Sequence, residues 1–371
     1  MRIYVFGTRG FPLVQGGVEK HCEHLYPRIA KEAEVIVYRR KPYIALSANA
    51  HYPGIRFVDL PSTRIKGFEA TWHSLLSTLH ILTQPAGIVH VHNIGPALFA
   101  PVLRLFGKKV VLTYHTANYE HDKWNITGQI LLRISEKIAL KYANAIIFIN
   151  RYRMQQFSAR VGRKSYYIPN GVEQPVLSSA VGYIEKWGLV DSKYLLTVGR
   201  ITPEKGFDVL IKAFLPIQTD YRLVIAGRAE AETKYDRQLT DLIDKQRIIF
   251  TGYVYGEELN QLYTHAALFV MPSVSEGFPL VLLEAMSYRL PLIVSDIPAT
   301  RLVALSPECY FPVGDVNALK EKLIAFMQEG QGRNPVAYDL SPFDWDRIAE
   351  QTMGVIRGER ANARTHERGN D

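Results

Sequence analysis

Short, continuously apolar runs rich in branched side chains are the feature that most constrains the fold of this chain. Tyr194–Val198 and Leu268–Met271 are two of them, and segments with helical periodicity separate most runs from the next. An apolar run without alternation indicates a strand buried on both faces, as in a parallel sheet covered by helices. Repeated β–α–β units are therefore predicted, which is typical of the α/β class. The predicted strands lie near Arg2–Phe6, Val35–Tyr38, Ile55–Leu60, Ile88–Val91, Val110–Tyr114, Ala145–Ile149, Tyr166–Ile168, Tyr194–Val198, Arg222–Ala226, Ile248–Thr251, Leu268–Met271, Pro291–Ser295 and Tyr310–Pro312.

The strand–helix series stops and restarts once. Pro169-Asn170-Gly171 is a turn signal after a strand, and Tyr194–Gly199 opens a second series. We therefore predict two Rossmann-like, doubly wound parallel-sheet domains that face each other across a cleft, with ligands at the carboxyl ends of their strands. The predicted parts are a first domain at 1–170, a second domain at 171–341, a helix at 342–357 and a flexible tail at 358–371. Ser341 is the expected cap of that helix.

Charge is distributed unevenly along the 371 residues, whose net charge is +8. Residues 1–170 contain 23 Lys and Arg against nine Asp and Glu, whereas residues 171–371 contain 21 against 27. A basic first half suggests an anionic partner such as membrane lipid or acidic glycan. The alternative explanation is that the positive charge maintains solubility and forms a diphosphate pocket. Nucleic acid is the weaker choice, because no known binding motif accompanies the charge.

The two cysteines, Cys22 and Cys309, imply no disulfide framework and fit a reducing compartment. The first residues are expected to form a strand rather than a signal peptide. No stretch approaches the length of a membrane-spanning helix.

The segment Met271–Met286, MPSVSEGFPLVLLEAM, holds Glu276 and Glu284 on either side of a turn that opens an apolar helix. Pro279 suits the first helical position, where no backbone donor is needed. Because helical side chains lean toward the N-terminus, Glu284 can reach back toward the helix start.

The amides of Gly277, Phe278 and Leu280 would then form an anion site at the positive helix end. A phosphate on these amides between two carboxylates is typical of sugar-nucleotide binding. A capped helix with two solvated carboxylates explains the segment equally well.

The first strand is followed by the glycine-rich stretch GTRGFPLVQGG, in which Gly16 and Gly17 open a helix. Glycines at this position let a backbone approach a ligand closely, or simply make a turn. The spacing is not that of a dinucleotide fingerprint, and the second strand ends in Arg39-Arg40 instead of an acidic residue. A dehydrogenase therefore loses support.

Three histidines lie at or near the ends of predicted strands. His115 follows the strand Val110–Tyr114, where α/β folds place ligands, and a neutral imidazole there can donate to a sugar hydroxyl. Its alternative role is to cap the strand end. His90 and His92 alternate and should face one side; without a nearby cysteine or carboxylate, a structural or lining role is expected.

Arg200 and Lys205 lie on the loop after the first strand of the second series, between Gly199 and Gly206. Two cations on such a loop can neutralise a diphosphate without a metal, although a solvated surface pair is the commoner case.

Taken in order, these segments resemble a retaining glycosyltransferase of family 4, with the two-domain GT-B architecture. The resemblance covers nearly the whole chain. It rests on the Gly16-Gly17 loop, TYHTA, GRITPEKG, FTGYV, SEGFPLVLLEAM and the final helix.

The resemblance implies that 1–170 is the acceptor-side domain, that 171–341 binds the nucleotide-sugar donor, and that the helix at 342–357 crosses back to the first domain. It also implies a role for each site residue. Arg200 and Lys205 would grip the donor diphosphate, and Glu284 would bind the ribose hydroxyls. Glu276 would hold the transferred sugar or stabilise charge on its reacting face, and His115 would contact the donor sugar. The remaining donor contacts implied are Gly16, Gly17, Tyr253, Val254, Gly277, Phe278, Pro279 and Leu280.

The function implied is transfer of a hexose-type sugar from a nucleoside-diphosphate sugar to a glycan acceptor, expected to be lipid-linked, in cell-surface polysaccharide assembly. No aspartate pair of the metal-binding kind is evident, so no metal and no cofactor are expected. We expect the protein to be cytoplasmic and peripheral on the inner face of the cell membrane. No nucleic acid partner is expected.

The membrane contact would involve the basic first domain and the stretch Ile65–Leu82, whose apolar residues could instead pack on the sheet. The cations expected to meet lipid are Lys31, Arg39, Arg40, Lys41, Arg64, Lys66, Lys108 and Lys109.

Two rival functions are also compatible with the sequence. A sugar-nucleotide epimerase also uses paired Rossmann-like halves, but no convincing set of acid and base residues is apparent. A non-catalytic nucleotide-sugar-binding protein would not need all four of Arg200, Lys205, Glu276 and Glu284.

Overall fold

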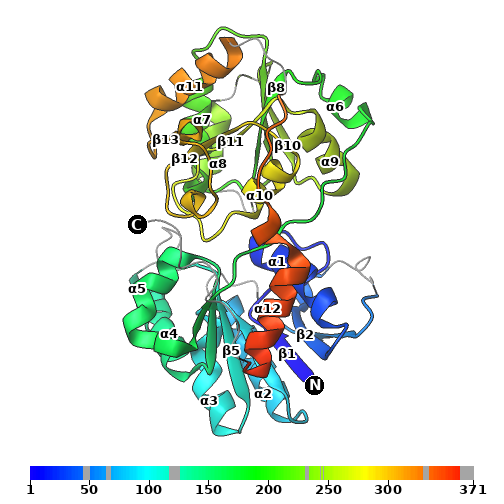
Figure 1. Cartoon of the computed structure of the whole chain (residues 1–371), viewed down its shortest axis with the longest axis vertical. Helices are drawn as coiled ribbons and strands as arrows, with labels where there is room; N and C mark the ends of the chain where they lie inside the picture. The colour runs from blue at the N-terminus through cyan, green and yellow to red at the C-terminus, as the bar shows by residue number, and fades with distance from the viewer. Residues whose placement is uncertain are drawn as a thin grey trace. The chain divides into compact units, whose positions relative to one another are not determined.

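The structure, a computed structural model, describes residues 1–44, 51–63, 68–116, 126–229, 234–242, 244, 246–328 and 334–359. Contacts divide the chain into two compact units. Unit 1 comprises Met1–Gly171 together with Phe343–Asp371, and unit 2 comprises Val172–Pro342. The last helix, Trp345–Arg357, thus packs within the first unit (Figure 1).

Unit 1 is built on a seven-stranded parallel sheet in the order β3-β2-β1-β4-β5-β6-β7. The direction of winding reverses between β1 and β4, so right-handed crossovers place helices on both faces. The strands are β1 Arg2–Phe6, β2 Glu34–Arg40, β3 Ile55–Leu60, β4 Ile88–His92, β5 Lys109–Tyr114, β6 Ala145–Phe148 and β7 Ser165–Tyr167. The helices are α1 Gly17–Ile29, α2 Glu69–Leu82, α3 Ala100–Leu105, α4 Ile126–Tyr142, α5 Arg151–Val161 and α12 Trp345–Arg357.

Unit 2 repeats this design with a six-stranded parallel sheet in the order β10-β9-β8-β11-β12-β13. The strands are β8 Tyr194–Val198, β9 Arg222–Ala226, β10 Ile248–Gly252, β11 Leu268–Met271, β12 Leu292–Ser295 and β13 Tyr310–Phe311. The helices are α6 Gly182–Lys186, α7 Phe207–Phe214, α8 Lys234–Asp241, α9 Gly256–His265, α10 Leu280–Ser287 and α11 Val316–Gln328.

The predicted fold class is confirmed, and each predicted strand is present in the described part of the chain. In five of these strands the middle residues are fully buried: Val5, Val91 and Leu112 in unit 1, and Leu196 and Val270 in unit 2. Continuous burial explains why these runs are apolar throughout instead of alternating.

The last helix begins later than its sequence suggests. The Asp344 carboxylate accepts from the Arg347 amide at 2.9 Å and caps α12, whereas Ser341 lies in a preceding 3₁₀ turn. The expected cap at Ser341 is therefore wrong. Within unit 1, α12 packs against α1 (Figure 1), and the Arg28 guanidinium donates to Asp346 Oδ1 at 2.8 Å.

Candidate functional site

The candidate site in unit 2 lies where the winding of its sheet reverses. Strands β8 and β11 are neighbours there, and their carboxyl ends continue into the loops 199–206 and 272–279. Loops leave such a point in opposite directions and open a crevice at the strand ends, which is where open α/β sheets bind ligands. Arg200 and Lys205 lie on the first loop and Glu276 on the second.

An ion pair joins the two loops. The Lys205 ammonium lies 2.5 Å from Glu276 Oε1, and the Ser273 hydroxyl donates to the same oxygen at 2.9 Å. Both charged side chains are largely buried, with 16% and 13% of their surfaces exposed. The pair is thus held in a defined position instead of being a solvated surface contact.

The backbones of the two loops also touch. The Val274 amide donates to the Glu204 carbonyl at 2.8 Å. Gly206 has φ +64°, and a Cβ there would lie 2.2 Å from the Pro272 carbonyl oxygen. Glycine is therefore required both by its left-handed backbone and by this close approach.

The helix after the second loop begins one residue later than predicted. Helix α10 starts at Leu280, and Pro279 is the residue before it, with φ −77° and ψ 108°. Pro279 is thus not at the first helical position, but it still ends the loop. Phe278, Pro279 and Leu280 are buried and Gly277 is partly exposed, so side-chain packing fixes the helix start beside the Lys205–Glu276 pair.

Glu284 lies one turn into α10 and is held by a residue that sequence reasoning missed. The hydroxyl of Tyr263 on α9 donates to Glu284 Oε2 at 3.1 Å, and the ring of Tyr288 stacks on Tyr263 with centroids 5.0 Å apart. Burial, with the Glu284 charge, raises the pKa of Tyr263 well above its ordinary value, so this hydroxyl keeps its proton. A tyrosine five residues before a strand gives no sequence signal of this role.

Tyr253 and Val254 follow the carboxyl end of β10. Val254 is buried, and Tyr253 is half-buried with the Arg228 guanidinium carbon 5.7 Å from its ring centroid. Arg228 follows β9, so an aromatic ring and a cation lie together at the same edge of the sheet as Lys205 and Glu276. Arg228 is a second site residue that sequence reasoning did not identify.

In unit 1, Gly16 and Gly17 lie at the end of the loop that connects β1 to α1. A Cβ on Gly16 would lie 2.0 Å from Glu19 Oε2. The other Glu19 oxygen accepts from the Thr8 hydroxyl at 3.0 Å and from the Arg9 amide at 2.9 Å. Glu19, which the sequence did not single out, therefore braces this loop from inside.

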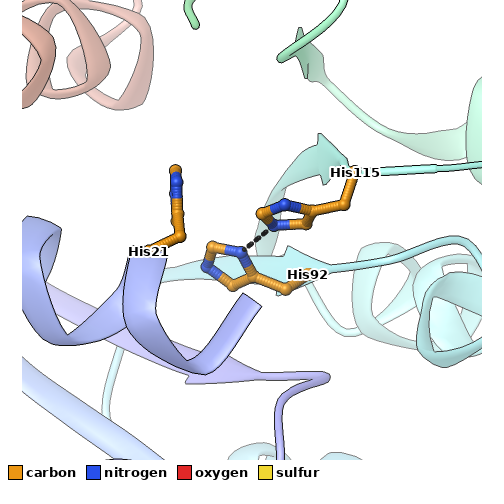
Figure 2. Close-up of side chains that lie close together, drawn as sticks. All are labelled: His21, His92 and His115. Atoms are coloured by element: carbon orange, nitrogen blue, oxygen red, sulfur yellow. Dashed lines mark hydrogen bonds between the residues drawn. The ribbon is translucent and has the colours of Figure 1, made fainter. Parts of the chain in front are cut away.

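His115 meets two other histidines in a buried cluster in unit 1 (Figure 2). His115 follows β5, His92 ends β4, and His21 projects from α1; their exposed fractions are 5%, 0% and 3%. His92 Nδ1 and His115 Nε2 are 2.9 Å apart. Burial lowers the pKa of His21 to about 4 and keeps the pKa values of His92 and His115 well below the ordinary value, so all three rings are neutral at pH 7.

A chain of hydrogen bonds leads away from this cluster. His92 Nε2 is 2.5 Å from the Tyr26 hydroxyl, which is also 2.9 Å from His90 Nδ1. His90 Nε2 in turn lies 2.7 Å from Thr113 Oγ1. Both strand histidines thus face Tyr26, as their alternation predicts, and neither takes part in an ion pair in the described part of the chain.

The basic surface of unit 1 differs from the prediction. Arg39 and Arg40 are buried and paired with Asp59, at 2.6 Å, and Glu69, at 3.2 Å. The ammonium groups of two lysines are likewise committed to backbone carbonyls. Lys108 donates to Gln84 and Pro85, and Lys109 donates to Ile356.

The expectation that those four cations meet lipid is therefore wrong, because each has a partner within the fold. Lys31 and Lys41 are exposed, whereas Arg64 and Lys66 lie outside the described residues.

Comparisons with known proteins agree with this architecture. The family described as glycosyl transferases group 1 matches residues 183–338, and Glycosyltransferase Family 4 matches residues 15–174. The chain is 29% identical over 283 residues to a phosphatidyl-myo-inositol mannosyltransferase of Mycobacterium leprae, and the matched region covers 72% of each protein. It is 29% identical over 211 residues to the O-antigen chain mannosyltransferase B of Escherichia coli, which covers 54% of each chain.

Solved structures show the same fold. Sucrose-phosphate synthase from Thermosynechococcus elongatus matches with a TM-score of 0.81 and 21% identity over 96% of this chain and 98% of that one. Anabaena HepE in complex with UDP and glucose matches with a TM-score of 0.78 and 17% identity over 96% and 99%. In the described residues, every helix is too short or too polar to cross a bilayer.

The two family matches together span most of the chain, and the named relatives are transferases, which does not favour the epimerase or the non-catalytic alternative. This chain therefore belongs to the glycosyltransferases of family 4 type, with the two-domain GT-B fold.

Proposed function

We propose that this glycosyltransferase moves a hexose-type sugar from a nucleoside-diphosphate sugar to a hydroxyl group of a glycan acceptor, with retention of configuration and without a metal ion. The acceptor is a lipid-linked saccharide in cell-surface polysaccharide assembly. Support comes from relatives named as mannosyltransferases of phosphatidylinositol and of O-antigen chains, one of them GDP-mannose-dependent. A further support is the fold neighbour in complex with UDP and glucose.

The observation that carries this proposal is the Lys205–Glu276 pair at the reversal point of the second sheet. A departing nucleoside diphosphate gains negative charge as the glycosidic bond breaks. A cation fixed beforehand by a carboxylate needs no reorganisation when that charge develops, which is how preorganised sites lower a barrier. Arg200, on the same loop, supplies a second cation.

The remaining residues take the following roles in the proposal. Glu284, oriented by Tyr263, accepts from the ribose hydroxyls, and Tyr253 and Val254 line the base pocket. The backbone at Gly277, Phe278 and Leu280 meets sugar hydroxyls and phosphate. From unit 1, Gly16 and Gly17 approach the phosphate and His115 contacts the donor sugar. The acceptor attacks from the face that the diphosphate leaves, and a donor phosphate oxygen takes its proton.

Removing either member of the ion pair tests the proposal. In Glu276→Gln and Lys205→Ala, turnover is expected to fall about 100-fold or more, because transition-state charge loses a fixed partner. Release of nucleoside diphosphate from a panel of UDP- and GDP-sugars, with a membrane extract as acceptor, measures this. Lys212→Ala is the matched control, since it removes an exposed lysine 3.1 Å from Asp208 on α7. Wild-type turnover in either site variant contradicts the assignment.

The proposal includes peripheral binding to an anionic membrane on its cytoplasmic face, through the outer side of unit 1. Helix α2 buries four polar residues together with Ile81: His73, Ser74, Ser77 and Thr78 are at most 1% exposed. The apolar residues that it leaves exposed are Phe68 at its N-cap position, Trp72 and Leu79. The expected alternative, in which the apolar face packs on the sheet, is therefore wrong for these three residues.

Helix α4 presents a second amphipathic surface. Three exposed isoleucines are spaced four residues apart: Ile126, Ile130 and Ile134. A row of exposed basic residues with the same spacing lies next to them: Arg133, Lys137 and Lys141. Both α2 and α4 contact the 3₁₀ turn Pro96–Phe99. The two acidic residues on α2 and α4, Glu69 and Glu136, are engaged with Arg40 and Tyr114. Apolar rows beside lysine and arginine suit an anionic lipid surface.

Vesicle co-sedimentation tests this surface. The wild-type chain is expected to bind vesicles that contain phosphatidylglycerol, less so at high salt, and to ignore pure phosphatidylcholine. Ile130→Gln with Ile134→Gln should weaken binding at least several-fold, because apolar area is lost. Leu177→Gln with Val190→Gln, which changes two exposed apolar residues of unit 2, is the matched control. Equal binding by both double variants would contradict the assigned surface.

A further inference from the structure

The histidine cluster of unit 1 has a feature that hydrogen bonding does not explain. Among the described residues, His21 Nε2 has no hydrogen-bond partner, although its ring is 97% buried. A buried imidazole nitrogen without a partner is costly and therefore unusual. The His21 ring lies beside those of His92 and His115, at 5.5 and 4.9 Å between ring centroids (Figure 2).

The three rings offer ligand atoms that converge. One nitrogen from each of His21, His92 and His115 lies within 4.8 Å of the others. A tetrahedral zinc ion with Zn–N bonds of about 2.0–2.1 Å needs nitrogens roughly 3.3 Å apart. The His92–His115 distance of 2.9 Å is already close to this value, so His21 is the side chain that must move inward.

Hydrogen-bond partners hold His21 and His92 in ligating tautomers. His115 Nε2 donates to His92 Nδ1 in the metal-free chain, so metal binding requires the His115 proton to move to Nδ1. Asn170 Oδ1 lies 2.8 Å from His21 Nδ1, so the amide oxygen accepts from the N–H there and leaves a lone pair on Nε2. On the other side, His92 Nε2 can donate to Tyr26, Tyr26 to His90, and His90 to Thr113. When the hydrogen bonds donate in this direction, His92 Nδ1 also carries a lone pair. A ligating histidine in proteins is generally oriented by such a partner.

We propose that His21, His92 and His115 form a site for one divalent transition-metal ion of the zinc type, bound through His21 Nε2, His92 Nδ1 and His115 Nε2. Imidazole ligands favour Zn²⁺, Co²⁺, Ni²⁺ and Cu²⁺ over Mg²⁺ and Ca²⁺. Three protein ligands leave one coordination position open. Burial favours the neutral rings, the form that binds metal, and the depressed pKa values of all three agree with this.

The site is separate from the transfer chemistry proposed above, which uses no metal. In the proposed function, on which this consequence rests, His115 contacts the donor sugar, and a bound ion would withdraw that histidine. Metal and donor are therefore expected to compete, and the ion acts as an inhibitor.

Cobalt binding to the full chain, stripped of metal with a chelator, is the test. Titration with Co²⁺ should give visible d–d bands of a low-symmetry site that saturate at one ion per chain and disappear when Zn²⁺ is added. His21→Gln should weaken binding at least ten-fold, and Asn170→Ala should weaken it about ten-fold, because His21 Nδ1 loses its hydrogen-bond partner. Circular dichroism of each variant checks that it is folded.

The matched control is His24→Gln. His24 lies three residues further along α1 and stacks on Trp345 with centroids 5.5 Å apart, outside the cluster. The His24→Gln variant should bind cobalt as tightly as the wild-type chain does. The proposal is overturned if the wild-type chain takes up no cobalt at micromolar concentrations, or if His21→Gln binds it equally well. Because cobalt uptake needs no sugar nucleotide, these outcomes do not depend on the proposed transferase reaction.

Discussion

Gly206 lies where the two loops of the candidate site in unit 2 meet, and its missing side chain leaves room for the Pro272 carbonyl. In Gly206→Ala, the left-handed backbone should cost about 1–2 kcal/mol of stability. The overlap with Pro272 adds to this and should separate Lys205 from Glu276, so turnover falls as well. Chemical denaturation and the transfer assay measure the two effects.

Gly314→Ala is the control for this prediction. Gly314 has φ +75°, but the space around its Cβ position is open to 4 Å, so only the backbone cost applies. The prediction is wrong if both alanine variants lose the same stability and the same activity.

Single-residue partners were the hardest part to predict from sequence. The positions of Lys205 and Glu276 after neighbouring strands were predictable, because parallel strands end at one edge of a sheet. The pairing of Arg39 with Asp59 and of Arg40 with Glu69 was not predictable, because each partner lies on a different element. The approach of His21 to His92 and His115 depends in the same way on how α1 crosses the strand ends.

At the scale of elements, helix α2 is the one whose orientation departs from simple expectation. Its buried face consists of His73, Ser74, Ser77 and Thr78 together with Ile81, so four of these five buried residues are polar. The Ser74 and Ser77 hydroxyls donate to the Ala70 and His73 carbonyls of the preceding turn, which satisfies them without a partner on the sheet. A hydrophobic pattern alone cannot reveal this, because small hydroxyl residues can fill either face.

Burying the polar face of α2 should make the fold sensitive to acid. Burial, with the neighbouring Arg40 charge, lowers the pKa of His73 to about 4, against about 6.5 in the unfolded chain. The unfolded state therefore binds a proton first as the pH falls. The stability that neutral His73 provides is complete above pH 6.5 and is lost progressively between pH 6.5 and 4, by about 3 kcal/mol.

His73→Leu isolates this contribution. The free energy of unfolding of the variant relative to the wild-type chain should be constant above pH 7 and should rise toward pH 4. Urea denaturation at half-unit pH intervals gives both curves. Parallel curves over the whole range would show that His73 does not cause the acid sensitivity.

At the scale of the whole molecule, the two units divide the charge. The basic half predicted an anionic partner, and the structure shows that part of that charge neutralises carboxylates inside unit 1. The fold itself was predictable because it depends on runs of apolar residues, which the chain displays in order. The surface was less predictable from the sequence, since the exposure of a residue depends on which elements cover it.

Binding of a nucleoside diphosphate by the loops after β8 and β11 through Lys205 is tested most directly by thermal unfolding with and without such ligands. A ligand at 100 times its dissociation constant stabilises the folded state by about 2.7 kcal/mol. UDP or GDP should raise the melting temperature of the wild-type chain and of Lys212→Ala, and Lys205→Ala should lose most of that rise. If no nucleoside diphosphate stabilises the wild-type chain, or if Lys205→Ala responds as fully as the control, the account is contradicted.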